Sequence, residues 1–130
     1  MKQNHKLALV MLAGIALGGA GATAIQAQQA KVAPGYVVAE VEVADTDAFA
    51  KYGAAVPGTL APFNGQFLVR GGKIQAVEGD PPKQRFVVIA FDSVEKARAW
   101  EDSPAYEAIK PIRHASAHSR VFIVEGVAPQ

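Results

Sequence analysis

The chain of 130 residues contains no cysteine, and its 13 basic residues almost balance its 12 acidic ones. Without cysteine the chain can form no disulfide, no thiolate metal site, no cysteine nucleophile and no acylated lipoprotein cysteine. The balanced charge lacks the clustered basic face that nucleic-acid binding needs, so we expect no nucleic-acid partner. Half of the residues are hydrophobic, which excludes disorder of the whole chain. The length suits one ordinary domain.

The first thirty residues have the pattern of a secretory signal peptide. A short basic start precedes an apolar stretch, Leu7 to Leu17, and small residues follow it. We predict cleavage after Ala27, with Ala24 and Ala30 as alternative positions. An uncleaved membrane anchor is the competing interpretation, but glycines and a polar tail dilute the apolar stretch below what a span requires.

This pattern predicts a periplasmic or secreted protein with no membrane role once the signal peptide is removed. In this interpretation, residues 1–27 are the signal peptide and 28–34 a linker, 35–126 form the domain, and 127–130 are a tail. An exported domain without disulfides must be stabilised by its hydrophobic core, and about 100 residues are enough for that.

Apolar alternation and turn residues predict the elements of the domain. The predicted strands are Tyr36–Val43, Gly65–Arg70, Arg85–Phe91 and Arg120–Glu125. A helix capped by Asp45 should carry Phe49, Tyr52 and Val56 on one face, with Pro57-Gly58 marking a break or a change of direction. A second helix should be capped by Asp92 or Ser93, and Ser103-Pro104 should start a further helical segment.

Two glycines after the second strand predict a tight hairpin. Gly71 and Gly72 can both adopt the positive φ angles that a two-residue turn requires. The segment Lys73–Glu78 would then be the return strand. The prolines of Gly79-Asp80-Pro81-Pro82 should make the next residues a loop, because proline cannot donate to a strand ladder.

The order of these elements is that of the split βαβ motif, a ferredoxin-like α+β fold with one antiparallel sheet and helices on one face. Both faces of this sheet are apolar in sequence. One face carries Val37, Ala39, Val41, Val87, Ile89, Phe91, Val121 and Ile123, and the other carries Tyr36, Val38, Phe86, Val88, Phe122 and Val124. Helices can cover one face, so a second copy of the chain should cover the other. A register slip at a bulge is the alternative explanation.

Several segments also resemble the domain-of-unknown-function family 1330. They are Tyr36-Val37-Val38-Ala39-Glu40-Val41, Phe67-Leu68-Val69-Arg70-Gly71-Gly72-Lys73, Arg98-Ala99-Trp100 with Ser103-Pro104 and Tyr106, and Arg113-His114. The resemblance covers Gly35 to Gly126. It implies a dimeric α+β barrel, in which two ferredoxin-like protomers pack sheet against sheet. That superfamily includes cofactor-free oxygenases, haem-binding enzymes and a lactone isomerase, whereas this family has no assigned reaction. The export signal departs from the many family members that look cytoplasmic.

Four residues are candidates for ligand binding: Arg70, Arg113, Trp100 and Tyr106. The planar guanidinium of arginine suits a carboxylate or a phosphate. The alternative for the arginines is an ion pair with Glu78, Asp80 or Glu107. The alternative for the two aromatic residues is core packing.

His114 is the candidate catalytic residue, because histidine can transfer protons near neutral pH. If the segment is helical, His114 and His118 lie on one face, four residues apart. No third ligand follows at a recognisable spacing, so we predict no metal site, and we also predict no cofactor.

These observations favour an exported homodimer that binds a small, possibly anionic organic molecule, with or without catalysis. A catalytic version would use His114 for proton transfer, and Arg70 or Arg113 would hold the substrate. The alternative function is a non-enzymatic interaction or stress-related module. Polar side chains that converge on a concave, partly dry pocket would favour the ligand-binding homodimer.

Overall fold

The computed structural model describes residues 32–130, so the predicted signal peptide and most of the predicted linker lie outside the described residues. Ala33–Val127 form one compact unit. The elements of this unit are β1 (Gly35–Val43), α2 (Thr46–Leu60), the 3₁₀ helix η1 (Ala61–Phe63), β2 (Gln66–Arg70), β3 (Arg85–Phe91), α3 (Val94–Glu101), α4 (Pro104–Ser116) and β4 (Ala117–Glu125). Within residues 32–130, every helix is too short or too polar to cross a lipid bilayer.

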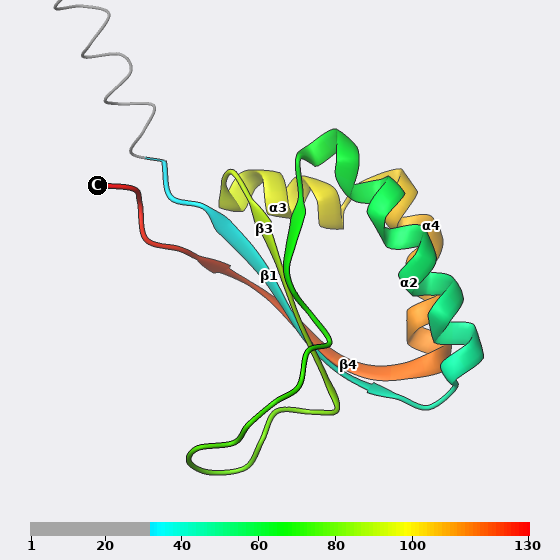
Figure 1. Ribbon diagram of the computed structural model, residues 1–130. Helices are drawn as coiled ribbons and strands as arrows, with labels where there is room; N and C mark the ends of the chain where they lie inside the picture. The colour runs from blue at the N-terminus through cyan, green and yellow to red at the C-terminus, as the bar shows by residue number, and fades with distance from the viewer. Residues whose placement is uncertain (1–31) are drawn as a thin grey trace, which may run out of the picture. The chain divides into compact units, whose positions relative to one another are not determined.

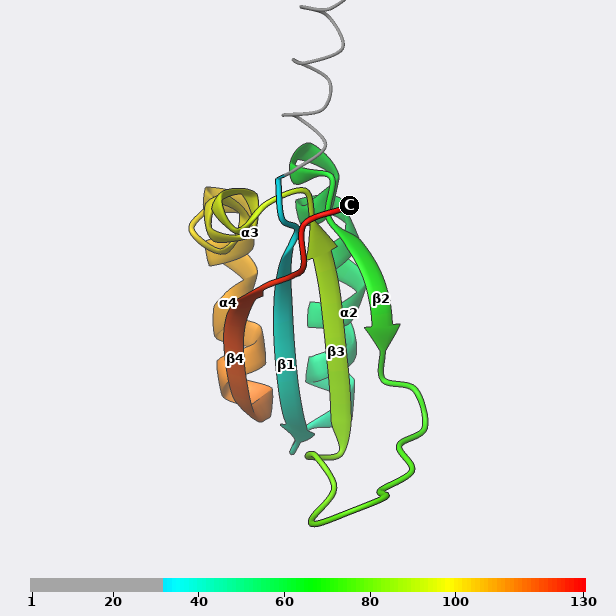
Figure 2. The same cartoon turned by 90° about the vertical axis from the view of Figure 1, so that its left-hand side faces the viewer.

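The four strands form one antiparallel sheet in the order β2-β3-β1-β4. Helices α2, α3 and α4 all lie on one side of it, as Figures 1 and 2 show. In the central strand β1, Val38 lies opposite Val88 of β3 and Phe122 of β4. This arrangement confirms the predicted ferredoxin-like α+β fold.

The two faces of the sheet differ in what covers them. On the inner face, which the helices cover, Val37, Val41, Ile89 and Phe91 are buried. The outer face carries the second predicted set of apolar residues (Tyr36, Val38, Phe86, Val88, Phe122 and Val124), and Phe122 and Val124 are 44% and 45% exposed. Both faces are therefore apolar, as the alternation predicted, and no described element packs over the outer one (Figure 2).

Side-chain caps define where α3 and α4 begin. Ser93 caps α3, and its Oγ accepts a hydrogen bond from the Lys96 N–H at 3.1 Å. Ser103 caps α4 in the same way, and Pro104 occupies the first helical position. The Ser103 cap was predicted, and Ser93 was one of the two predicted caps of α3 beside Asp92, because a side-chain oxygen satisfies an amide that has no partner within the helix.

Helix α2 continues through Pro57, where the sequence predicted a break or a change of direction. Proline has no N–H to donate to the carbonyl one turn earlier, which here belongs to Gly53. The Arg70 Nη2 of β2 donates to this carbonyl instead, at 2.8 Å. A side chain from the sheet thus satisfies the acceptor that Pro57 leaves free, and the helix extends to Leu60.

The predicted hairpin after β2 is wrong. Lys73–Glu78 form no strand, and β2 pairs directly with β3 across an exposed loop of residues 71–84. Gly71 does adopt the positive φ of 70° that was expected, and its N–H donates to the Phe86 carbonyl. The strand prediction failed because no burial favours an extended segment there, as the 94% exposure of Val77 illustrates.

Trp100 lies at the centre of the core and is 1% exposed. Its ring stacks on Tyr106 with centroids 3.9 Å apart. Its Nε1 donates to the Thr59 Oγ1 at 3.0 Å, and this hydroxyl donates in turn to the Val56 carbonyl. The stack and the hydrogen bond therefore join α2, α3 and α4.

Replacing Thr59 with valine should lower the free energy of unfolding by about 1–3 kcal/mol, because the buried indole N–H would lose its acceptor while the shape is kept. Urea unfolding measures this change. The control Thr46→Val, at the exposed start of α2, should change the stability by no more than about 0.5 kcal/mol. Equal effects of the two substitutions would contradict the assigned role of Thr59.

Candidate functional site

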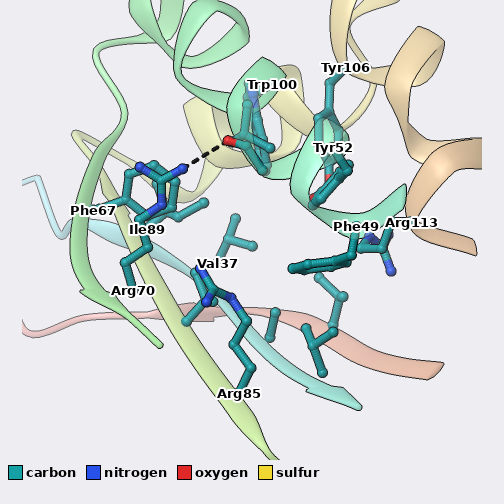
Figure 3. Close-up of a pocket in the computed structure, with 16 residues that line it drawn as sticks. Val37, Phe49, Tyr52, Phe67, Arg70, Arg85, Ile89, Trp100, Tyr106 and Arg113 are labelled. Atoms are coloured by element: carbon teal, nitrogen blue, oxygen red, sulfur yellow. Dashed lines mark hydrogen bonds between the residues drawn. The ribbon is translucent and has the colours of Figure 1, made fainter. Parts of the chain in front are cut away.

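A cavity of about 50 Å³ lies between the inner face of the sheet and the helices (Figure 3). Its walls are mainly apolar and aromatic. The lining residues are Val37, Ala39, Val41, Phe49, Tyr52, Gly53, Val56, Phe67, Arg70, Arg85, Val87, Ile89, Trp100, Tyr106, Arg113 and Val121. The cavity thus combines an apolar interior with three guanidinium groups.

Four of the five predicted site residues line this cavity: Arg70, Arg113, Trp100 and Tyr106. They come from β2 and from the consecutive helices α3 and α4, and packing on the sheet brings the strand and the helices together. Core packing was the alternative role for Trp100 and Tyr106. Both are core residues, and both also line the cavity, so the two roles coincide.

Arg70 lies at the exposed side of the cavity and joins the sheet to α2. Its guanidinium is 4.3 Å from the Phe67 ring centroid and donates to the Gly53 carbonyl. No carboxylate within residues 32–130 forms an ion pair with it. Arg70 therefore forms none of the ion pairs that the sequence offered as its alternative role.

Arg113 is the most deeply placed of the three arginines, with 7% of its surface exposed. It lies in the last turn of α4, and its Cζ is 5.9 Å from the Tyr52 ring centroid. Its Nε is buried without a hydrogen-bond partner, and no carboxylate of residues 32–130 pairs with it. Glu107, the considered partner, binds Lys110 instead at 2.7 Å.

A buried guanidinium N–H without a hydrogen-bond partner is costly, because it has lost its contact with water and gained no acceptor. The cost is offset if an anion binds beside it. Arg113 therefore gives the cavity a donor without an acceptor among residues 32–130.

Arg85 also lines the cavity, and the sequence-based reasoning missed it. It is half-buried, with its Cζ 5.7 Å from the Phe49 ring centroid. A Cβ on Gly71 would lie 2.5 Å from the Arg85 Nη1, so glycine leaves room for this side chain. Its position could have been predicted, because it shares the inward parity of Val87 and Ile89.

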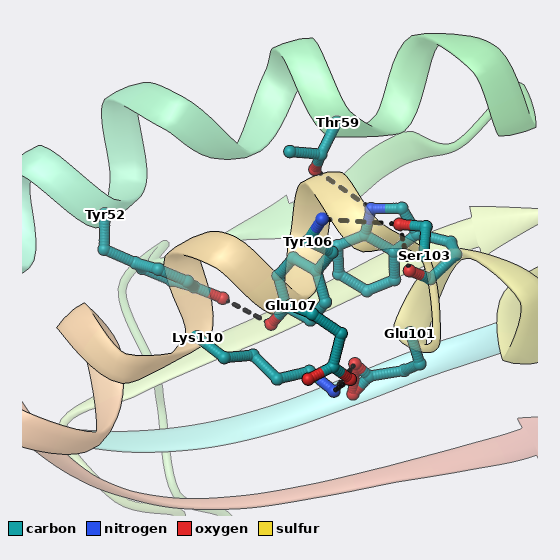
Figure 4. Close-up of polar contacts among 8 residues, drawn as sticks. Tyr52, Thr59, Glu101, Ser103, Tyr106, Glu107 and Lys110 are labelled. Carbon is teal, nitrogen blue, oxygen red and sulfur yellow. Dashed lines mark hydrogen bonds and ion pairs between the residues drawn. The ribbon is translucent and has the colours of Figure 1, made fainter.

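Two phenols meet at the wall of the cavity. The Tyr52 and Tyr106 hydroxyl oxygens are 2.7 Å apart (Figure 4). Burial is the main cause that raises the pKa of the Tyr106 phenol far above its ordinary value of about 10, and the neighbouring Tyr52 adds to it. Tyr106 therefore keeps its proton in the folded protein.

Lys110 and two carboxylates lie around the Tyr106 ring. The Lys110 Nζ is 5.3 Å from the ring centroid and 3.6 Å from the Glu101 carboxylate. Partial burial alone would lower the pKa of Lys110, but the hydrogen bond to Glu107 and the charges of Glu101 and Glu107 raise it overall. The ion pairs keep this lysine charged beside the core.

His114 is exposed on α4 and does not line the cavity. The structure thus gives the hypothesised proton transfer no contact with the binding residues. His118 lies in β4, since α4 ends at Ser116, so the two histidines do not share a helical face. Within residues 32–130 no group of three metal-ligating side chains is found.

This fold and this cavity define a ferredoxin-like α+β protein with a partly open, arginine-lined cavity between its sheet and its helices. The model of one family, described as a domain of unknown function (DUF1330), matches residues 34–127. The chain belongs to this family. No curated protein matches it.

Solved structures share the fold at low sequence identity. A protein of unknown function from Rhodopseudomonas palustris is 16% identical, with a TM-score of 0.62 over 81% of this chain and 93% of that one. SnoaB, a cofactor-independent oxygenase from Streptomyces nogalater, is 18% identical, with a TM-score of 0.51 over 72% and 92%. A dimeric ferredoxin-like protein of unknown function from Thermobifida fusca is 19% identical, with a TM-score of 0.51 over 73% and 92%.

The raised pKa of Tyr106 predicts a loss of stability in alkali. Above pH 10 the unfolded chain releases this proton while the folded chain keeps it, so the free energy of unfolding should fall with pH by up to about 1.4 kcal/mol per unit. Replacing Tyr106 with phenylalanine removes this contribution. Urea unfolding between pH 8 and pH 11.5 should therefore give a shallower decline for the variant, and identical slopes would refute the assignment.

Proposed function

We propose that this chain is exported and, as a homodimer, binds a small organic anion in the cavity between sheet and helices. The observation that carries the proposal is the buried side chain of Arg113 at an apolar cavity, whose Nε has no hydrogen-bond partner and which pairs with no carboxylate of residues 32–130. The basic start, apolar stretch and small-residue exit of residues 1–27 support export.

The charge distribution around the cavity supports an anion rather than a neutral molecule. Arg70, Arg85 and Arg113 all line it, and none of them pairs with a carboxylate of residues 32–130. Three like charges repel one another, and the repulsion grows as the local dielectric falls. A bound anion would relieve the repulsion and would be drawn towards the two arginines on the more exposed side.

The polar groups also distinguish binding from the alternative of an interaction module. In such a module, the polar side chains would be paired or solvated. Here the Arg113 guanidinium and the Tyr52–Tyr106 hydroxyl pair converge on a concave, largely apolar space. This combination of an apolar interior with few polar groups is typical of small-molecule sites.

The uncovered outer face supports the homodimer. Phe122, Val124 and Leu68 are 44%, 45% and 59% exposed in the single chain. Burying such a surface is worth about 25 cal/mol per Å² of apolar area. The neighbouring structure from Thermobifida fusca is itself described as dimeric. A second copy packed on this face would exclude water from it.

Replacing Arg113 with methionine should abolish anion binding and, without ligand, raise the free energy of unfolding by about 1–3 kcal/mol, because a buried unsatisfied group is removed. Thermal unfolding with and without acetate, propionate, succinate and benzoate measures both effects. At least one of these acids should raise the melting temperature of the wild type.

Arg98→Met, on the exposed surface of α3, is the matched control and should keep the wild-type response. A wild type that no anion stabilises, together with an Arg113→Met variant of unchanged stability, would overturn the proposed function.

Replacing Phe122 with glutamate should convert the dimer to a monomer, because a charge would be buried at the contact between the two sheets. Sedimentation velocity at micromolar concentration measures the mass. Glu125→Gln, near the end of the same strand, should leave the dimer intact. A wild type that sediments as a monomer would exclude the dimer.

A further inference from the structure

The direction of the hydrogen bond between the two phenols follows from their surroundings. Tyr106 is 2% exposed, and within residues 32–130 its hydroxyl has one hydrogen-bond partner, the Tyr52 hydroxyl at 2.7 Å. If Tyr52 were the donor, the buried Tyr106 O–H would lack an acceptor, which is costly. Both directions fit the oxygen positions, and the one in which Tyr106 donates to the Tyr52 oxygen leaves the more deeply buried O–H with an acceptor.

This direction leaves the Tyr52 proton free to donate elsewhere. Tyr52 is half-buried and lines the cavity, and no other side chain of residues 32–130 accepts from it. Its hydroxyl, polarised by the bond from Tyr106, is a stronger donor than an isolated phenol. A ligand in the cavity is the acceptor that this donor lacks.

Arg113 supplies a second, charged donor beside the same ring. Its Cζ lies 5.9 Å from the Tyr52 ring centroid, and its Nε has no partner. Figure 3 shows Arg113 next to Phe49 on the same side of the cavity as Tyr52. A group held between them must accept hydrogen bonds at two oxygens and carry a negative charge, which describes a carboxylate.

The size of the cavity limits what can follow the carboxylate. A cavity that holds benzene has a volume of about 150 Å³, whereas this one has about 50 Å³. It accommodates about two to four non-hydrogen atoms. The carboxylate and an unbranched neighbouring carbon fit inside, whereas a carbon bearing three methyl groups does not.

We infer that Tyr52 and Arg113 form a subsite for the carboxylate of a short, unbranched organic acid. This inference rests on the proposed function and specifies its ligand class. The acid enters from the side of Arg70 and Arg85, and the far end of a longer chain extends towards them.

Isothermal titration of the wild type with propionate, propionamide and pivalate tests the inference. Propionate should bind at least about tenfold more tightly than propionamide, which lacks the charge, because charged hydrogen bonds are the stronger ones. Propionate should also bind at least about tenfold more tightly than pivalate, since overpacking a close-packed site is costly. Pivalate or propionamide binding as tightly as propionate would overturn the inference.

Tyr52→Phe should weaken propionate binding by about tenfold or more. Tyr36→Phe, on the opposite face of the sheet, should have no effect on binding. An equal affinity in wild type and Tyr52→Phe would overturn the role of Tyr52, and the wild-type comparison of three probes stands even if the variant fails to fold.

These outcomes separate the two proposals. If succinate or benzoate stabilises the wild type through Arg113 while propionate does not bind, the anion site stands and the short-acid inference fails. If no carboxylate binds and Arg113→Met behaves like the wild type, the proposed function fails as well.

Discussion

The alternation of side chains along the four strands is the constraint on which this structure depends. Since successive residues of a strand point to opposite faces, Val37, Ile89 and Phe91 must lie under the helices while Val38, Val88 and Phe122 lie on the other side. Apolar residues on both faces require two covering layers, and the helices of the chain supply one. The same alternation directs Arg85 inward, whereas Arg70 reaches the cavity because the register of β2 shifts between Phe67 and Val69.

Polar contacts hold the helices in place over the sheet and so shape the cavity between them. Pro57 frees the Gly53 carbonyl, and Arg70 binds it, so β2 and α2 are joined at one side. Thr59 binds the indole of Trp100, which joins α2 to α3 in the interior. The lining between these contacts is mainly apolar, with aliphatic side chains from the sheet and aromatic ones chiefly from the helices.

Arg113 gives the site its chemical character at a cost in stability. A methionine of similar length would pack against the same aromatic residues without an unsatisfied charge. A buried group that weakens the fold and has no partner within residues 32–130 is the kind of compromise found at binding sites. Members of the same fold class include a cofactor-independent oxygenase, but fold likeness alone transfers no reaction to this chain.

The sequence by itself predicted the ferredoxin-like fold, the Ser103 cap of α4 and the two apolar faces, because period-two alternation and capping depend on near neighbours. It also predicted Arg70, Arg113, Trp100 and Tyr106, which do meet at one cavity. The sequence could not predict that α2 continues through Pro57 or that residues 71–84 form an unpaired loop, since both features depend on partners distant in sequence. The tertiary structure alone decided that Tyr52 faces Tyr106 and that His114 stays outside the cavity, because these positions are fixed only when α2 and α4 pack on one sheet.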